Sequence, residues 1–448
     1  MRINQINLRG VGPFDDVELP LKAGTNPDLA DVYLLTGPNG SGKSTALYSL
    51  AGMIGCGHGN LGTDLGALRL RNFDSLASVI ADEGARAAAL LGSGSKMRDM
   101  ITIGPHMLNF ESGHGFTAYY KTKNTNNDYW QQAHNFRIDA PIEVRPKFSW
   151  AAFAYAGMRS VSDAKVTAIQ EPDYSPFEQS LSFVRTANTD RLAQWIANQD
   201  FKRLKAKEAG RTERSEQLNQ SVRDIERVVS EIIDEDFAFV TTDDDNNIRA
   251  RRNGIVTELG LLPDGLKSIV SWIADLLMRL DRIPWVDSTP PMKRPFLLLL
   301  DEVDIHLHPS WQRKVLPIVQ KLFPNAQIIA STHSPFVVAS ADDAQIITLK
   351  VTNGVSSLEH IRQSQTGISY SAVLRSIFGI DSEFDIETER AFSAFHEIKQ
   401  KVLIGNSTDI QKVRSLADDL ALRGEEVAQL VAIELRQFDR QLATIEAK

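Results

Sequence analysis

Short apolar stretches separated by glycine-rich breaks dominate the first sixty residues. Residues 3–8, 17–21 and 32–35 each read as a short strand, because apolar side chains recur in them. The third stretch runs directly into a glycine-rich loop at 37–45, and a helix-forming run follows to about residue 54. A strand, a glycine-rich loop and a helix in this order predict the first βα unit of an α/β protein.

The same alternation returns in the second half of the chain. Strand-like stretches at 237–240 and 248–251 flank a polar turn at 243–247. After them come, in order, a predicted helix at 264–280, a strand at 296–300, a helix at 310–322 and a strand at 327–331. This alternation predicts an α/β fold with a parallel sheet, and the wholly apolar stretch at 296–300 predicts a strand covered on both faces.

The residues between these two halves give a mixed pattern. Glycines and polar clusters interrupt 55–150, where we predict a helix near 75–91 and strands at 116–120 and 142–144. From about 190 to 235 the pattern is helical, and its second half carries a heptad seam: Leu218, Val222, Ile225, Val229 and Ile232. Because the seam covers only two heptads, it predicts a short helical arm rather than a long coiled coil.

The last hundred residues read as mostly helical, with 14 acidic and 9 basic side chains from Asp381 onward. Apolar residues recur there at helical spacing, which predicts packed helices; a docking surface for a partner or for oligomerisation is the alternative. We therefore divide the chain into an N-terminal lobe with a β-rich insertion (1–190), a helical arm (191–235), a second lobe (236–350) and a helical C-terminal region (351–448).

Composition narrows the function classes. The 448 residues carry 49 basic and 57 acidic side chains, and this net charge of −8 excludes a generally basic nucleic-acid binder. A local run at 202–214, with six basic and two acidic side chains, predicts a solvated face or, alternatively, a DNA or RNA contact. A single cysteine, Cys56, excludes internal disulfides and cysteine-paired zinc. With no apolar stretch long enough for a membrane, we expect a cytoplasmic protein with no membrane partner.

The glycine-rich loop matches the pattern G-x-x-x-x-G-K-[ST] at every fixed position. Its glycines allow backbone N–H groups to turn inward around an anion, and the following helix adds its positive N-terminal end. Lys43 is expected to reach the β- and γ-phosphates of a nucleotide, and the Ser44 hydroxyl to ligate Mg²⁺. The predicted nucleotide-binding residues are Gly37, Pro38, Asn39, Gly40, Ser41, Gly42, Lys43, Ser44 and Thr45.

A second motif supports the first: the apolar strand at 296–300 ends in two carboxylates, Asp301 and Glu302. Asp301 is the predicted second protein ligand of Mg²⁺, and Glu302 the residue that orients or deprotonates the attacking water. Lys43 and Asp301 lie 258 positions apart in the sequence, so one nucleotide site would be split around the insertion and the arm.

A third motif is a histidine at the end of the predicted strand 327–331. His333 in isolation reads as a core residue, but thirty residues after Asp301-Glu302 we interpret it as a sensor of the γ-phosphate. His306 and His308 could be mistaken for part of a metal-hydrolase cluster. Pro309 begins the next helix directly after them, and no later ligands follow, so we do not predict a metal there.

Together these residues resemble the ABC-type ATPases, specifically the soluble branch that includes RecF, Rad50 and the SMC proteins. The segments 301–309 and 331–335 more narrowly resemble bacterial ATP-binding proteins of anti-phage operons, including the Septu and retron-associated ATPases. The resemblance implies an ABC-type head split by an inserted lobe and a short arm, with ATP and Mg²⁺ as cofactors. It covers the head motifs and says little about residues 55–150.

The resemblance further implies that two heads sandwich ATP and that each offers a signature segment to its partner's nucleotide. The matching segment here is 262–268, with Leu262, Asp264 and Gly265 as the expected trans contacts. Pro263 stands where the family has serine, and proline has neither a hydroxyl nor an N–H, so hydrolysis is expected to be slow. Asp304 matches the D-loop near the dimer interface, and Arg159 lies where related ATPases often have a functional arginine.

The leading hypothesis is an ATPase that forms a head-to-head dimer, or a higher homo-oligomer, on ATP. It would regulate a separate effector, an HNH or other nuclease, in anti-phage defence, because this chain carries no nuclease pattern of its own. One alternative is a RecF-like repair or recombination ATPase that binds DNA directly through the helical arm. Another is an ATP-clamped scaffold with little turnover, which Pro263 favours.

Overall fold

The computed structural model describes residues 2–55, 76–81, 86–92, 112–113, 116–120, 132–133, 135–157, 173–183, 187, 189–241, 248–382, 384–405 and 409–446. The chain divides into two compact units, Met1–Val373 and Leu374–Lys448, which are treated separately below. Among the described residues, no helix combines the length and the apolar character that crossing a membrane requires.

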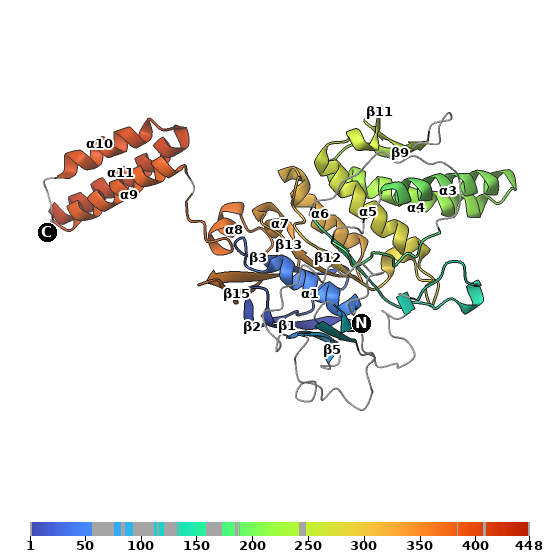
Figure 1. Cartoon of the computed structure of the whole chain (residues 1–448). Coiled ribbons are helices and arrows are strands. Elements are labelled where there is room, and N and C mark those ends of the chain that lie inside the picture. Colours follow the sequence, from blue (N-terminus) through green and yellow to red (C-terminus); the bar gives the residue numbers. More distant parts are fainter. Residues whose placement is uncertain are drawn as a thin grey trace. The chain divides into compact units, whose positions relative to one another are not determined.

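A large mixed sheet organises the first unit (Figure 1). Among the described residues its strand order is β6-β7-β5-β4-β1-β2-β15-β14-β3-β13-β12-β8. The strand bounds are β1 Ile3–Val11, β2 Phe14–Pro20, β3 Asp31–Thr36, β4 Leu76–Ala81, β5 Arg86–Gly92, β6 Ser112–Gly113, β7 Phe116–Tyr120, β8 Ala151–Tyr155, β12 Phe296–Leu300, β13 Gln327–Ser331, β14 Gln345–Thr352 and β15 Val355–Gln363. A separate sheet of order β11-β10-β9 contains β9 Phe237–Thr241, β10 Ile248–Arg252 and β11 Ile255–Glu258.

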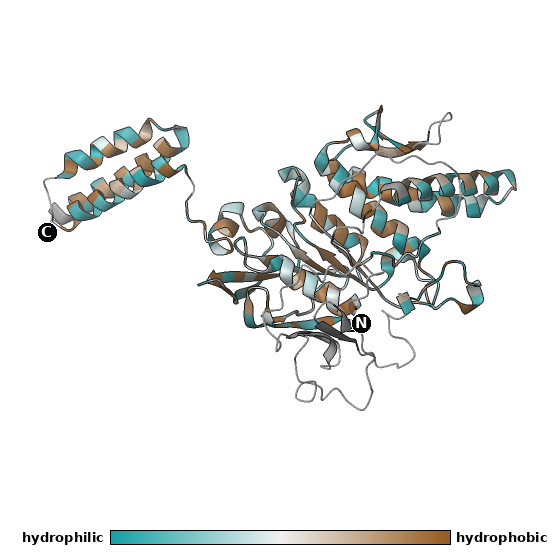
Figure 2. Ribbon diagram, in the orientation of Figure 1, coloured by the Kyte–Doolittle hydropathy of each residue, from teal (hydrophilic) through white to brown (hydrophobic). Residues whose placement is uncertain are grey.

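The half of the large sheet from β14 to β8 is parallel, as the alternating pattern predicts. β12 and β13 have the predicted bounds, and every residue of both strands is buried. Figure 2 shows these strands in the hydrophobic colour at the centre of the unit. A strand covered on both faces needs a continuous apolar run, which is why 296–300 could be assigned from the sequence.

Some helices of the first unit, such as α1, pack on this sheet, and others, such as α3, α4 and α5, pack on one another. Their bounds in the first unit are α1 Lys43–Gly55, α3 Thr189–Glu208, α4 Thr212–Ile233, α5 Asp264–Arg282, α6 Pro309–Leu322, α7 Pro335–Ser340 and, crossing into the second unit, α8 Tyr370–Ser376. The predicted arm is a hairpin in which α3 and α4 lie side by side, and α5 packs against both (Figure 1). Four of the five heptad positions are buried, so the seam serves packing within the unit.

Two local predictions are wrong. The stretch predicted as a helix near 75–91 contains strands β4 and β5, which pair antiparallel with each other, and β4 also pairs antiparallel with β1. Ile142–Val144, predicted as a strand, is a 3-10 helix. In both places the sequence pattern is short, and pairing or packing with distant residues decides the conformation. The predicted turn at 243–247 lies outside the described residues.

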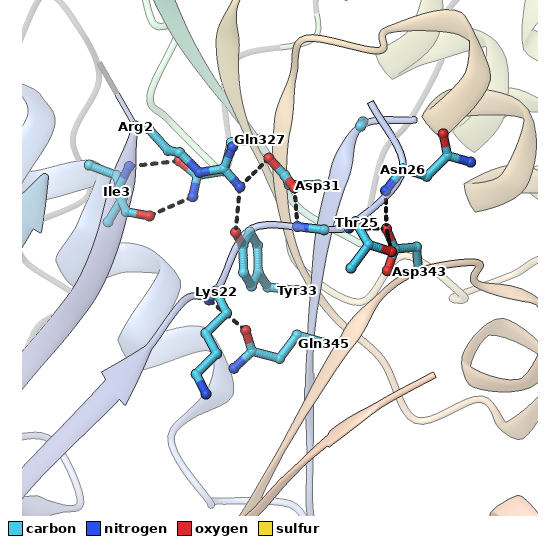
Figure 3. A network of polar contacts seen from close by, with 12 residues as sticks. Arg2, Ile3, Lys22, Thr25, Asn26, Asp31, Tyr33, Gln327, Asp343 and Gln345 are labelled. Atoms are coloured by element: carbon cyan, nitrogen blue, oxygen red, sulfur yellow. Dashed lines mark hydrogen bonds and ion pairs between the residues drawn. The ribbon is translucent and has the colours of Figure 1, made fainter. Parts of the chain in front are cut away.

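Two glutamines attach the β1–β2 hairpin to the parallel strands (Figure 3). The Gln327 amide accepts a hydrogen bond from the Ile3 N–H at 2.9 Å and donates one to the Ile3 carbonyl at 2.6 Å. Gln345 accepts from the Lys22 N–H and donates to the Pro20 carbonyl, both at 2.8 Å. Each buried amide therefore replaces one rung of a sheet ladder at the amino ends of the parallel strands.

The second unit is a bundle of α9 Ile386–Leu403, α10 Ile410–Ala421 and α11 Glu425–Glu446. Its core contains Phe392, Phe395, Val413, Leu420 and Phe438. The predicted helical region therefore has its own apolar core, although β15 occupies 355–363 ahead of it.

Candidate nucleotide-binding site

The glycine-rich loop joins β3 to α1 at the carboxyl end of the parallel strands. Gly37 and Gly42 have φ values of 137° and 88°, a region that L-residues rarely adopt. Space excludes a side chain as well: a Cβ on Gly37 would lie 2.3 Å from the Leu349 carbonyl oxygen, and one on Gly42 would lie 2.5 Å from the Phe14 ring. The loop therefore requires both glycines for its shape.

Lys43 begins α1 and is buried at the mouth of the loop. Its ammonium donates hydrogen bonds to the carbonyls of Gly37 at 3.0 Å and Pro38 at 3.1 Å. Burial lowers the pKa of Lys43, while the nearby carboxylates of Asp301 and Glu302 act in the opposite direction. The ammonium is thus held against the backbone of the loop that would surround a phosphate.

The two halves of the predicted site meet beside Lys43. The Ser44 hydroxyl donates a hydrogen bond to Asp301 Oδ1 at 3.0 Å, which joins α1 to the end of β12. Hydroxyl and carboxylate oxygens are ligand types that Mg²⁺ takes, so the donor chemistry fits the predicted metal. Two motifs from opposite halves of the sequence therefore form one site.

Ser331, at the end of β13, contacts both carboxylate residues, a role that the sequence pattern did not predict. Its hydroxyl donates to Asp301 Oδ1 at 2.5 Å and accepts from the Glu302 backbone N–H at 2.7 Å. Glu302 itself has a φ of 49°, a left-handed conformation that costs energy for a residue with a Cβ. A Cβ on Gly157 would lie 2.6 Å from Glu302 Cβ, so only glycine leaves room for the glutamate there.

Asp304 links the segment after β12 to the segment after β13. Its Oδ1 accepts hydrogen bonds from the Thr332 hydroxyl at 2.6 Å and from the His333 N–H at 3.3 Å. Gln312 on α6 extends this link, because its amide donates to the Asp304 carbonyl at 3.1 Å and accepts from the Ser334 hydroxyl at 2.6 Å. Thr332 and Gln312 lie in or next to segments that carry the family resemblance, but the sequence predicted no role for either in the site.

A cavity of about 770 Å³ opens beside these residues. It is lined by Gly12, Pro13, Asn39, Gly40, Gly42, Lys43, Ser44, Thr45, Glu302 and His333. The predicted loop residues Gly37, Pro38 and Ser41 are not part of its lining. The β1–β2 turn, which carries Gly12 and Pro13, forms a wall that the sequence did not predict.

His333 shares the cavity with Lys43 and Glu302. Burial lowers the pKa of the imidazole, the Lys43 ammonium lowers it further, and the neighbouring carboxylates partly oppose both. A lowered pKa keeps the ring neutral at neutral pH, where one of its nitrogens carries a hydrogen that can be donated.

The signature segment is separate from this lining. Gly265 lies buried in the first turn of α5, where a Cβ would come within 2.5 Å of the His306 carbonyl oxygen. Asp264 is exposed, and Leu262 is buried beside the turn. Pro263 precedes the helix and makes no side-chain capping bond. None of these four residues lines the cavity of its own chain, and Arg159 lies outside the described residues.

His308 has a local structural partner. Its Nδ1 accepts a hydrogen bond from the Ser310 N–H at 3.3 Å and so caps α6, with Pro309 as the first helical residue. Within the described ranges, no group of three or more His, Cys, Asp or Glu residues is arranged to hold a metal. The geometry of this segment is that of a helix start.

Segments of the chain that contain these motifs are similar to known protein families. A family model described as "AAA domain, putative AbiEii toxin, Type IV TA system" matches residues 162–339, and an "AAA domain" model matches residues 1–54. The Septu protein PtuA of Bacillus thuringiensis is 26% identical over 209 residues, 46% of this chain and 52% of that protein. The Retron Ec83 probable ATPase of Escherichia coli is 34% identical over 129 residues, 29% of this chain and 23% of that protein.

Among solved structures, the SMC head domain from Thermotoga maritima is similar with a TM-score of 0.41 and 14% identity, over 81% of this chain and all of that one. The chain covers about half or less of the curated relatives' own length. Both halves of the candidate nucleotide site fall inside the family matches, 1–54 and 162–339. Over part of its length the chain is therefore similar to the Septu and retron ATPases, and the matched segments contain the glycine-rich loop and the Asp301-Glu302 pair.

Proposed function

We propose that this chain binds ATP with Mg²⁺ and hydrolyses it. The observation that carries the proposal is the 3.0 Å contact between Ser44 Oγ and Asp301 Oδ1, which unites the two motifs beside Lys43. A bound Mg²⁺ would be held by these two oxygens and would neutralise charge on the phosphates. The loop N–H groups and Lys43 would hold the phosphate chain in the cavity.

Two residues would act on the γ-phosphate end of the nucleotide. Glu302 lines the cavity and is the candidate for orienting the attacking water and accepting its proton. His333 is held neutral, so its N–H can donate to a γ-phosphate oxygen. Ser331 and Gly157 position Glu302 without touching the nucleotide.

We further propose that ATP brings two chains together head to head. The signature residues Leu262, Asp264 and Gly265 do not line their own chain's cavity, so a second chain is the natural source of these contacts. Pro263 cannot supply the hydroxyl or N–H that a serine would offer, which predicts slow turnover and a long-lived dimer.

The dimer would control a separate effector in anti-phage defence. This part of the proposal rests on the names of the matched relatives, the Septu protein and the retron ATPase. The sequence carries no nuclease pattern, so we assign the destructive step to a partner, an HNH or other nuclease. The helical unit from Leu374 onward has its own core and is the candidate docking unit.

Glu302→Gln tests the central proposal because it keeps the side chain's shape and removes its negative charge. We expect ATP binding to persist, phosphate release to fall by about 10²–10⁴-fold, and the ATP-dependent dimer to become longer-lived in light scattering. Lys43→Ala is the control that should lose ATP binding and dimerisation together. Unchanged phosphate release by Glu302→Gln, or no change of mass with ATP in either protein, would contradict the proposal.

A further inference from the structure

A second cavity lies in the helical hairpin, outside the nucleotide site. It has a volume of about 350 Å³ and is built from three helices, α3, α4 and α5, which lie together in Figure 1. Its lining includes Trp195, Gln199, Lys202, Arg214, Asp281 and Arg282. Lys202 and Arg214 are the two ends of the basic run that the nucleotide site leaves unexplained.

Two polar groups in this lining have no hydrogen-bond partner among the described residues. They are the indole N–H of Trp195 and the amide oxygen of Gln199, whose side chains belong to residues only 2% and 7% exposed. Buried polar groups are nearly always paired, because leaving them unpaired forfeits their bonds to water. A donor and an acceptor left open beside one cavity indicate a ligand that can both accept and donate hydrogen bonds.

Charge identifies the class of that ligand. Three cations, Lys202, Arg214 and Arg282, face one carboxylate, Asp281. Asp281 is already engaged, since it accepts from the Ser221 hydroxyl at 3.1 Å and from the Gln199 amide at 3.2 Å. Positive side chains therefore outnumber negative ones in the lining, which suits an anion that several cations can contact at once, such as a phosphate monoester.

We propose that this cavity binds a small phosphorylated molecule of up to mononucleotide size. The volume falls at the lower end of the range for small-molecule sites, far above the space that a single phosphate needs. The side-chain amides and the Trp195 indole can pair with the polar groups of a sugar or a base, while the cations hold the phosphate.

The same phosphate chemistry occurs on a nucleic-acid backbone. A backbone contact needs an open basic surface that follows consecutive phosphates, whereas this site is a cavity enclosed by three helices. The geometry therefore favours a free small molecule.

The test uses the full chain with its nucleotide site saturated by Mg²⁺ and a non-hydrolysable ATP analogue. Titration calorimetry then measures the binding of AMP, of inorganic phosphate and of a short single-stranded oligonucleotide. We expect saturable binding of AMP or phosphate, weakened roughly tenfold or more by Arg214→Glu. Lys207→Glu, the same charge reversal at an exposed residue of the basic run outside the lining, should leave it unchanged.

Trp195→Phe keeps an aromatic ring and removes the unpartnered N–H, and we expect AMP binding to weaken severalfold. The proposal is overturned if neither AMP nor phosphate binds saturably, or if the Arg214 and Lys207 variants weaken binding equally. Preferential binding of the oligonucleotide, reduced alike by both charge reversals, would identify a basic surface for nucleic acid and overturn it as well.

Discussion

Strands β3 and β13 have polar side chains at both ends, and the two ends are used differently. At the amino ends, Asp31 and Gln327 have partners in the fold: Asp31 pairs with Arg2, and Gln327 joins the Ile3 backbone (Figure 3). At the carboxyl ends, the glycine-rich loop after β3 lines an open cavity, and the buried Ser331 at the end of β13 holds Asp301 and Glu302. The same two strands therefore tie the unit together at one edge and leave room for chemistry at the other.

This difference shows what each set of hydrogen bonds is for. The amino-edge glutamines bond to backbone groups that would otherwise be buried and unpaired, so their loss should reduce stability. The carboxyl-edge serine bonds to groups that would handle the nucleotide, so its loss should reduce turnover. Substituting one residue at each edge therefore distinguishes the effect on stability from the effect on turnover.

Gln327→Leu should have the largest effect. It leaves the N–H and the carbonyl of Ile3 without partners, which we expect to cost about 2–4 kcal/mol of unfolding free energy. Denaturant unfolding measures the loss, and the exposed Gln365→Leu is the matched control, expected to stay within about 0.5 kcal/mol of the parent. ATP affinity should be unchanged in folded protein. A stable variant with weakened ATP binding would break the comparison.

Ser331→Ala should give a smaller effect, and the effect should be on turnover and not on stability. Removing the hydroxyl takes away one of the hydrogen bonds to Asp301 Oδ1 and the acceptor of the Glu302 N–H, and we expect kcat for ATP to fall about tenfold while KM changes little. Ser331→Thr, which restores a hydroxyl, should recover most of the rate. Ser180→Ala is the control, because that buried hydroxyl has no hydrogen-bond partner among the described residues. A tenfold rise in KM with normal kcat would argue against a positioning role.

The parallel strands of the sheet could be predicted from the sequence, whereas the antiparallel strands β4 and β5 could not. The parallel strands could be assigned from sequence because a strand buried on both faces needs a continuous apolar run, as in 296–300. The stretch 76–92 is rich in alanine and leucine, which favour helices, yet it forms β4 and β5. Pairing of β4 with the distant strand β1 overrides that local preference, and a local pattern carries no information about such a partner.

In the candidate site, too, some residues could be predicted from the sequence and others could not. Lys43, Ser44, Asp301, Glu302 and His333 could be chosen because each belongs to a motif with fixed spacing. Ser331 and Gly157 could not, because their roles depend on distances between neighbouring strands. Gly157 matters only where Glu302 takes up its left-handed conformation. The one available signal was position, since both residues follow or end a strand of the parallel sheet.

The smallest expected effect is on the pH dependence of Tm. It differs between His333 at the carboxyl edge of the sheet and Gln327 at the amino edge. Burial and Lys43 lower the pKa of His333 below its ordinary value of 6.5, so the unfolded chain takes up this proton more readily than the folded one. The corresponding stability is present above about pH 6.5 and is lost as the pH falls towards the folded pKa. His333→Gln should therefore reduce the drop in Tm between about pH 7.5 and about pH 5.5 by roughly one degree.

Gln327→Leu provides the contrast for this measurement, because an amide does not titrate. Its Tm should lie below that of the parent by the same amount at both pH values, whereas the difference between His333→Gln and the parent should change with pH. A pH-independent difference for the histidine variant would show that the imidazole has the same pKa in the folded and unfolded chains. The groups around the cavity would then not be what keeps the His333 ring neutral for the proposed γ-phosphate contact.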